Sequence, residues 1–202
     1  MSRSKLVTRS RLVGGLGAVI AAATLTAVPL TGGSAGAAAP AAAPVATVVD
    51  DCLLSVPDPG KTRPVKICYS LFRPAGATSE DRAPMIVHSH GWGGSRTKDP
   101  YDFQAFTDAG YGVLSFDQRG FGQSGGHAYV ENPKIEGRDV RRVVALISRL
   151  PWVQLDAPGD PRLGSIGGSY GGGYQYLSAF QRLRTTGSTV VDAMAPQITW
   201  FD

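Results

Sequence analysis

The residues with the clearest chemical potential surround Ser169. The stretch Gly-Gly-Ser-Tyr-Gly around it matches the pattern G-x-S-x-G. It lies between an apolar segment that predicts a strand, Leu163–Gly168, and a segment that predicts a helix, Tyr174–Leu183. A tight turn in this setting lifts a serine oxygen above the edge of a sheet, with a helix N-terminus behind it. We therefore predict that Ser169 is an acyl-transfer nucleophile and that Gly167 and Gly171 permit the turn; the alternative is a glycine-rich turn with an idle serine.

A second glycine-rich segment, His90-Gly91-Trp92-Gly93-Gly94, follows the apolar run Pro84–Ser89, which predicts a buried strand. Glycines at such a position let the backbone approach the carbonyl oxygen of a substrate. The backbone N–H of Trp92 would then pair with the N–H of Tyr170 to form an oxyanion hole. We interpret His90 as a structural histidine bonded to backbone, and not as a base.

A third segment, Asp117 to Gly126, contains the spacing G-x-G-x-x-G. A dinucleotide site needs a helix that opens directly from such a loop, because the helix N-terminus binds the pyrophosphate. Here about ten residues, including Pro133, precede the next helical pattern at Glu136. We therefore assign no nucleotide site to this loop and predict no cofactor.

The elements that must position these segments alternate between strand and helix. Such alternation predicts a largely parallel sheet covered on both faces. We expect strands at Pro84–Ser89, Tyr111–Phe116, Leu163–Gly168 and Thr189–Ala195, and helices at Tyr101–Ala109, Ile135–Leu150 and Tyr174–Leu183.

Cys52 and Cys68 are the only two cysteines, and the pattern around them predicts a hairpin. The segments Thr47–Val56 and Pro64–Phe72 are rich in Val, Ile, Leu and Tyr, and strong turn residues separate them. A hairpin about that turn would place the two thiols opposite each other, and an oxidising compartment would favour a disulfide. The alternative is a pair of buried free thiols. Two thiols without matching histidines make a poor zinc site, so we predict no metal.

The N-terminus has the composition of an export signal. Basic residues up to Arg11 precede a 19-residue run of apolar, small and threonine residues, Leu12 to Leu30, and then the small-x-small triplet Ala35-Gly36-Ala37. We predict a signal peptide over residues 1–37, an Ala/Pro-rich linker over residues 38–47, and a secreted protein without membrane attachment after cleavage. The alternative is a single transmembrane anchor, since a run of 19 residues nearly spans a bilayer.

Charge and composition exclude two classes of protein. The 20 Lys+Arg outnumber the 16 Asp+Glu only because four basic residues lie in the first 37, so the remainder is neutral. Without excess positive charge there is no counterion release to drive nucleic-acid binding, and we predict none. A hydrophobic content of 43% excludes a disordered chain.

Taken together, the motifs resemble those of the α/β-hydrolase superfamily. Their order is most similar to its Xaa-Pro dipeptidyl-peptidase and cocaine-esterase-like branch. The resemblance covers residues 84–202 and rests on His90-Gly91-Trp92-Gly93, Asp117-x-Arg119-Gly120-x-Gly122-x-Ser124, Leu150-Pro151-Trp152 and Gly167-Gly168-Ser169-Tyr170-Gly171-Gly172. It implies an α/β fold, mostly parallel with an antiparallel hairpin at its start, and acyl-enzyme cleavage of a small ester or peptide. Branch members often place a tyrosine hydroxyl in the oxyanion hole where this chain has Trp92, so we expect backbone donation here.

The superfamily order of serine, acid and histidine is incomplete in this sequence. All three histidines precede Ser169, and the last predicted strand is about the sixth of the eight usual in the fold. We therefore expect residues 48–202 to be the N-terminal portion of a larger catalytic domain, with little activity alone. Two hypotheses stay open: an exported serine hydrolase, and a non-catalytic exported binding or vestigial domain on the same fold.

Overall fold

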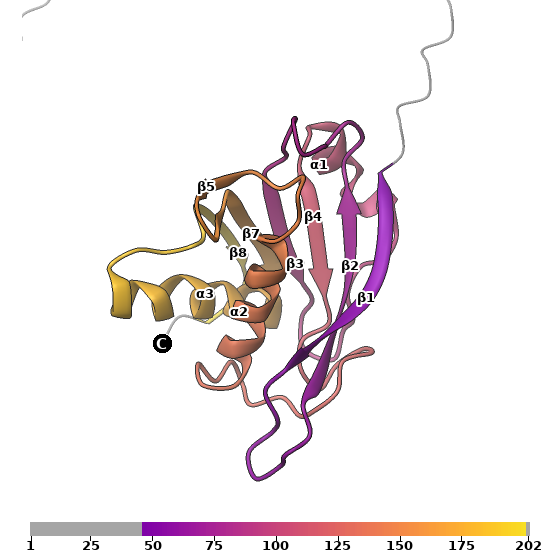
Figure 1. The fold of residues 1–202 in the computed structure, drawn as a ribbon. Coiled ribbons are helices and arrows are strands. Elements are labelled where there is room, and N and C mark those ends of the chain that lie inside the picture. Colours follow the sequence, from indigo (N-terminus) through magenta and orange to yellow (C-terminus); the bar gives the residue numbers. More distant parts are fainter. Residues whose placement is uncertain (1–45, 201–202) are drawn as a thin grey trace, which may run out of the picture. The chain divides into compact units, whose positions relative to one another are not determined.

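The computed structural model describes residues 46–200, in which six strands form one mixed sheet (Figure 1). The strand order across the sheet is β1-β2-β4-β3-β7-β8, and a separate short hairpin pairs β5 with β6. In chain order the elements are β1 (Thr47–Ser55), β2 (Val65–Arg73), β3 (Met85–Ser89), a 3₁₀ turn (Pro100–Phe103), α1 (Gln104–Asp108), β4 (Gly112–Phe116), α2 (Glu136–Ile147), β5 (Leu155–Ala157), β6 (Asp160–Pro161), β7 (Leu163–Gly168), α3 (Tyr170–Thr186) and β8 (Ala193–Gln197). The predicted signal peptide and nearly all of the predicted linker lie outside the described residues. Among the helices that are described, none is long and apolar enough to cross a bilayer.

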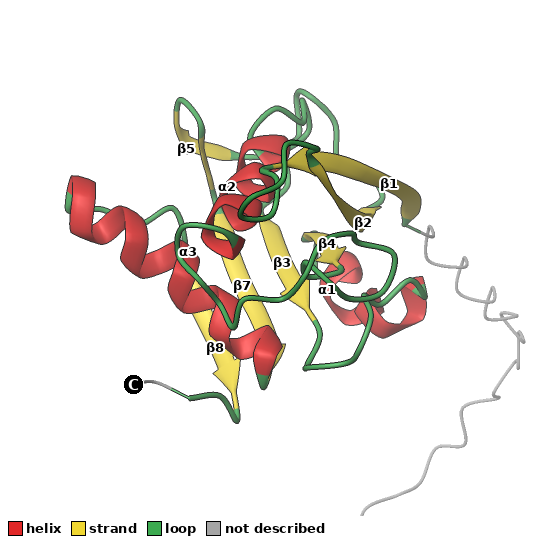
Figure 2. Ribbon diagram, turned by 90° about the horizontal axis from the view of Figure 1, so that it is seen from below, coloured by secondary structure: helices red, strands yellow, loops and turns green. Residues whose placement is uncertain are grey.

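The sheet starts antiparallel and continues parallel, which confirms the expected architecture. β1 and β2 form a hairpin, and β2 runs antiparallel to β4. β4, β3, β7 and β8 then run parallel to one another (Figure 2). Parallel strands end at a common edge, so the segments that follow β3, β4 and β7 begin side by side. These are the three glycine-rich segments that the motifs occupy, and the predicted nucleophile and oxyanion donors lie on those after β3 and β7.

The hairpin brings the two cysteines together as predicted. Cys52 is the register partner of Cys68, and the two form a disulfide with an S–S distance of 2.06 Å. Cys52 is exposed on the edge strand β1, whereas Cys68 is buried beneath it.

Helices cover the two faces of the sheet, and each face has its own apolar cluster. Successive residues of a strand point to opposite faces, so Met85 and Val87 pack with α2 on one side while Ile86 faces the other. The larger cluster joins β2, β3, β4 and β7 to the inward stripe of α2 at Val140, Val143, Val144 and Ile147. The smaller cluster joins Phe72, Ile86 and Val113 to Phe103 of the 3₁₀ turn.

Three predicted elements differ most from the structure. The strand expected over Thr189–Ala195 is wrong in its first half, because Thr189 Oγ1 accepts the Val191 N–H at 3.0 Å and forms a turn. The helix expected from Tyr174 begins four residues earlier, at Tyr170. The helix expected over Tyr101–Ala109 divides into the 3₁₀ turn and the short α1. The strand predicted at Leu163–Gly168 has the same bounds as β7, and the helix predicted over residues 135–150 is the shorter α2.

Candidate active site

Ser169 occupies a strained turn between β7 and α3. Its φ of 53° lies in the left-handed region, which a residue with a side chain seldom adopts. The Ser169 carbonyl oxygen accepts the N–H groups of Gly172 at 2.8 Å and Gly173 at 3.2 Å, which begins the helix directly after the serine. Its own N–H donates to Gln197 O at 2.9 Å, which ties the turn to β8. The half-buried hydroxyl has no hydrogen-bond partner within residues 46–200.

The two flanking glycines are needed because neighbouring backbone lies too close for any side chain. Gly167 has a φ of 150°, and a Cβ there would lie 2.7 Å from Ser89 O. A Cβ at Gly171 would lie 2.8 Å from the Ser89 carbonyl carbon and 3.0 Å from His90 O. The predicted requirement for glycine at both positions thus follows from the close approach of the chain leaving β3.

The segment after β3 passes beside the serine. An added Cβ at Gly91 would lie 3.6 Å from the Ser169 Cβ. A turn follows, closed by the Gly94 N–H donating to Gly91 O at 3.0 Å, with Trp92 at its second position. Neither the Trp92 N–H nor the Tyr170 N–H has an acceptor among the described residues. The structure therefore places two uncommitted backbone donors on the two segments that meet at Ser169.

Aromatic rings surround this meeting point. The Tyr170 ring is buried and lies 5.0 Å from the Trp92 ring, 5.6 Å from Phe121 and 6.0 Å from Trp200, measured between centroids. Trp92 and Trp200 are 60% and 43% exposed, so an apolar surface flanks the serine on the solvent side. Burial raises the pKa of the Tyr170 hydroxyl, as do the charges of Glu131 and Glu136. Tyr170 therefore stays neutral and serves as a wall of the site.

The structure confirms that His90 is bonded to backbone. Its Nε2 accepts the Gln118 N–H at 3.1 Å, so the proton is on Nδ1, which donates to Gly91 O at 2.8 Å. Burial lowers the pKa of this imidazole, which is thus neutral. The ring joins the segment after β3 to the segment after β4.

The other two histidines also make their contacts away from Ser169. His88 lies on β3, with Nδ1 2.9 Å from Ser115 Oγ, and burial lowers its pKa to about 4. His127 is largely exposed, with Nδ1 3.0 Å from Asp58. Within the described part of the chain, no histidine is in position to take the proton of Ser169.

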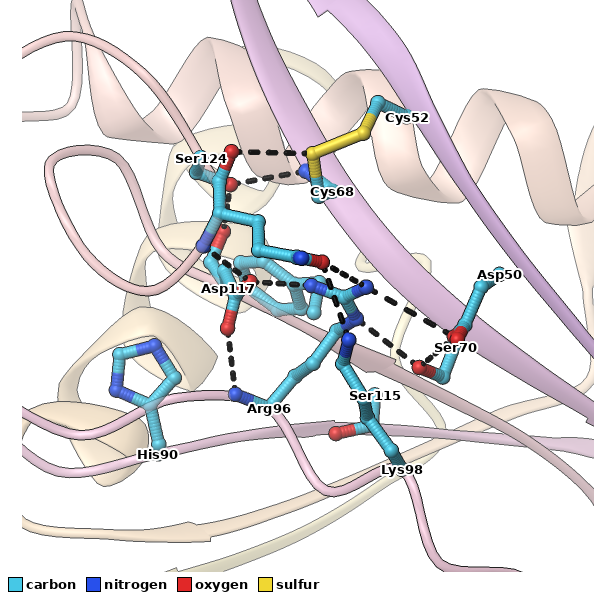
Figure 3. Close-up of polar contacts among 12 residues, drawn as sticks. Asp50, Cys52, Cys68, Ser70, His90, Arg96, Lys98, Ser115, Asp117 and Ser124 are labelled. Carbon is cyan, nitrogen blue, oxygen red and sulfur yellow. Dashed lines mark hydrogen bonds and ion pairs between the residues drawn. A yellow bond between two sulfur atoms is a disulfide. The ribbon is translucent and has the colours of Figure 1, made fainter.

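A buried ion pair lies beside the segment that follows β3 and was not foreseen from the sequence. Arg96, at 5% exposure, forms an ion pair with Asp117, and its backbone N–H donates to the same carboxylate (Figure 3). Its Nε donates to Ser70 Oγ at 3.0 Å and its Nη2 to Gln123 Oε1 at 2.8 Å. The available signal was Asp117 directly after a buried strand, because a charge there needs a partner.

Glu131 and Glu136, whose backbone N–H and carboxyl group respectively contact the Tyr170 hydroxyl, were also missed. Val130 and Glu131 both have positive φ, of 54° and 61°, and this backbone turns the Glu131 side chain inward against Gly173 of α3. Burial, followed by the charge of Glu136, raises the pKa of Glu131 to about 9.

Among residues 46–200 no group of three or more His, Cys, Asp or Glu side chains could hold a metal ion.

Comparison with known proteins now identifies the family. The family model described as X-Pro dipeptidyl-peptidase (S15 family) matches residues 63–202. The chain belongs to this family. Its fold is that of the α/β hydrolases: the solved α/β hydrolase GrgF from Penicillium sp. sh18 superposes with a TM-score of 0.53 at 18% identity, over 74% of this chain and 46% of that protein.

Two curated proteins are similar in sequence over about half of this S15-family chain. An uncharacterized 31.7 kDa protein of Escherichia coli, in the traX-finO intergenic region, is 34% identical over 103 residues, which are 50% of this chain and 34% of that protein. The quorum-quenching protein AidA of Acinetobacter baumannii is 35% identical over 118 residues, 57% of this chain and 36% of that protein. The chain thus spans about a third of the length of the curated relatives that it matches.

Proposed function

We propose that this protein is an exported serine hydrolase that cleaves ester or peptide bonds through an acyl-enzyme on Ser169. The observation that carries the proposal is the conformation of Ser169: a residue with a side chain, at a φ of 53°, between a parallel strand and a helix N-terminus. Strain of this kind persists only where surrounding structure holds it, and it is concentrated at functional sites. A serine without a chemical role would be strained in this conformation, whereas glycine adopts a positive φ at no steric cost.

In the proposed reaction, Ser169 Oγ attacks the carbonyl carbon of the substrate and gives up its proton to a base. The negative charge moves to the carbonyl oxygen, which accepts hydrogen bonds from the N–H groups of Trp92 and Tyr170. The tetrahedral intermediate then expels the alcohol or amine, which takes up the proton, and water later releases the acid. None of His88, His90 and His127 is placed to be this base, because all three are engaged elsewhere.

Family membership supports peptides with proline in the second position as one substrate class to test. The exposed rings of Trp92 and Trp200 support an apolar group next to the scissile bond. The disulfide supports an oxidising compartment, and hence export by the basic and apolar segment before Ala37.

The test is hydrolysis by the protein in its full natural length. A short acyl ester and an Xaa-Pro arylamide are compared for wild type, Ser169→Ala and the control Ser79→Ala, which alters an exposed serine far from the site in sequence. We expect Ser169→Ala to lose at least about 10³-fold in kcat on any substrate that is cleaved, and the control to match wild type. Activity that survives Ser169→Ala would refute the nucleophile. A folded wild type that cleaves neither substrate would support the non-catalytic alternative.

Export has its own test. The intact mass of the protein recovered from the medium should lack about the first 37 residues. Recovery of the uncleaved chain in the membrane fraction would instead support the anchor.

A further inference from the structure

The disulfide contacts the segment after β4 as well as the hairpin that it closes. Cys68 holds the segment after β4 on both sides: its N–H donates to Ser124 Oγ at 2.8 Å, and its carbonyl oxygen accepts the Asp117 N–H at 2.8 Å. Ser124 Oγ in turn donates to Asp117 O at 2.7 Å, and Cys68 Sγ lies 3.3 Å from Gln123 O. The buried end of the disulfide is therefore part of the contact surface of this segment (Figure 3).

The segment after β4 also holds residues 90–96, here called the oxyanion segment because it carries the Trp92 N–H. The Asp117 carboxylate accepts from both the backbone N–H and the guanidinium of Arg96. At the other end of the oxyanion segment, Gln118 donates its N–H to His90 Nε2 at 3.1 Å and its side-chain amide to His90 O at 3.2 Å. Trp92 lies between these two anchors, so their positions fix where its N–H points.

Strand β1 supplies a second connection. Asp50 lies two residues before Cys52 and so shares its face of the strand. Asp50 accepts a hydrogen bond from Ser70 Oγ, and its carboxylate lies 3.8 Å from Arg96 Nη2. The disulfide joins β1 to β2 within this patch and keeps Asp50 in register over Arg96.

We propose that the Cys52–Cys68 disulfide is a positioning element of the active site, which sets the placement of the Trp92 N–H through Ser124, Asp117 and Arg96. This inference rests on the proposed function, since it assigns a role to the oxyanion segment. The alternative is a disulfide that only stabilises the hairpin. Oxyanion donors contribute when they lie within tenths of an ångström of the developing charge, so a small displacement is visible in kcat.

The first experiment compares Cys52→Ser with Ile147→Ala in the protein of full natural length. Ile147 is fully buried on α2, in an apolar cluster that contains no residue of the oxyanion segment, so the second variant matches the loss of stability without the loss of positioning. Well below both melting temperatures, we expect Cys52→Ser to lower kcat about tenfold with KM changed less than twofold. Ile147→Ala should keep the wild-type kcat. Equal kcat values for Cys52→Ser and wild type would overturn the proposal.

A double-mutant cycle with Ser124→Ala tests the connection itself. Ser124→Ala removes the bridge between Cys68 and Asp117, so its effect on kcat and that of Cys52→Ser should not multiply. We expect the double variant to be no more than about twofold slower than the slower single variant. Fully multiplicative effects would show that the disulfide does not act through Ser124.

Reversible reduction gives an independent measurement. A small dithiol attacks the exposed Cys52 sulfur, and the reagent is oxidised to a cyclic disulfide while Cys52 and Cys68 each gain one proton and one electron. Wild-type kcat should fall about tenfold and recover on reoxidation, whereas Cys52→Ser should not respond. If wild type is active and reduction changes nothing, the positioning role fails while the proposed function stands. If wild type shows no serine-dependent activity at all, the proposed function fails first.

Discussion

Substituting Glu131 by Gln should make the protein more stable, and increasingly so as the pH rises. Glu131 is 8% exposed, and neither oxygen of its carboxyl has a hydrogen-bond partner within residues 46–200. Its pKa is raised from 4.5 to about 9 by burial and by the nearby charge of Glu136. The folded protein therefore keeps the proton through neutral pH, while the unfolded chain releases it.

The sign and size of the effect follow from this difference in proton binding. Below pH 4.5 both states bind the proton and the carboxyl adds no pH dependence. Between pH 4.5 and about 9 the folded state holds one more proton than the unfolded state, so stability falls with rising pH by about 1.4 kcal/mol per pH unit. At pH 7 the accumulated loss is about 3 kcal/mol. Glutamine has the same shape and no proton to lose, so Glu131→Gln avoids this loss.

Urea unfolding at pH 5, 6, 7 and 8 measures the effect for wild type, Glu131→Gln and Glu80→Gln. The difference between Glu131→Gln and wild type should be small at pH 5 and reach about 3 kcal/mol at pH 7. Glu80 is exposed, so its variant should follow wild type from pH 6 to pH 8. A difference that does not change with pH would mean that Glu131 ionises normally in the folded protein, and would refute the buried neutral carboxyl.

Other predictions concern the groups that hold the site in place. Arg119 contacts Asp58 at 2.8 Å and Asp139 at 2.6 Å with its side chain fully buried, so Arg119→Met should cost about 3–5 kcal/mol in urea unfolding by leaving two buried carboxylates; a loss below about 1 kcal/mol would show the pairs to be solvated. Gly171→Ala would bring a Cβ within 2.8 Å of the Ser89 carbonyl carbon, and we expect a loss of about 3 kcal/mol together with lost activity; a crystal structure with an unmoved turn would contradict this. Reducing the disulfide, which spans 16 residues, should lower the free energy of unfolding by about 3 kcal/mol, and an unchanged urea midpoint would count against that estimate.

The sequence was sufficient for features that depend on local pattern. Apolar runs with turn residues at their ends located β3, β4 and β7, and the symmetry of the hairpin paired Cys52 with Cys68. The glycine-rich turn located Ser169 between strand and helix. The strand signals and the glycine-rich turn each lie within about ten consecutive residues, and the hairpin signal is continuous from Thr47 to Phe72.

Features that depend on long-range contacts could not be predicted from the sequence. α3 begins at Tyr170, four residues before the predicted start, and its first turn contains Gly171 to Gly173, which are small because Ser89, Thr199 and Glu131 approach them. The partners of Arg96 and Arg119 lie 20 or more residues away in sequence, so spacing gave no indication of them. The inward turn of Glu131 depends on a backbone conformation that its residue type does not favour.

The central claim is that Ser169 is the nucleophile, and covalent labelling tests it most directly. The protein of full natural length is treated with a fluorophosphonate, and the adduct is located by intact mass and peptide mapping. We predict a single adduct on the peptide containing Ser169, absent in Ser169→Ala while that variant keeps the wild-type melting temperature within about 2 °C. An adduct on a different serine, or hydrolytic activity without any adduct at Ser169, would contradict the account.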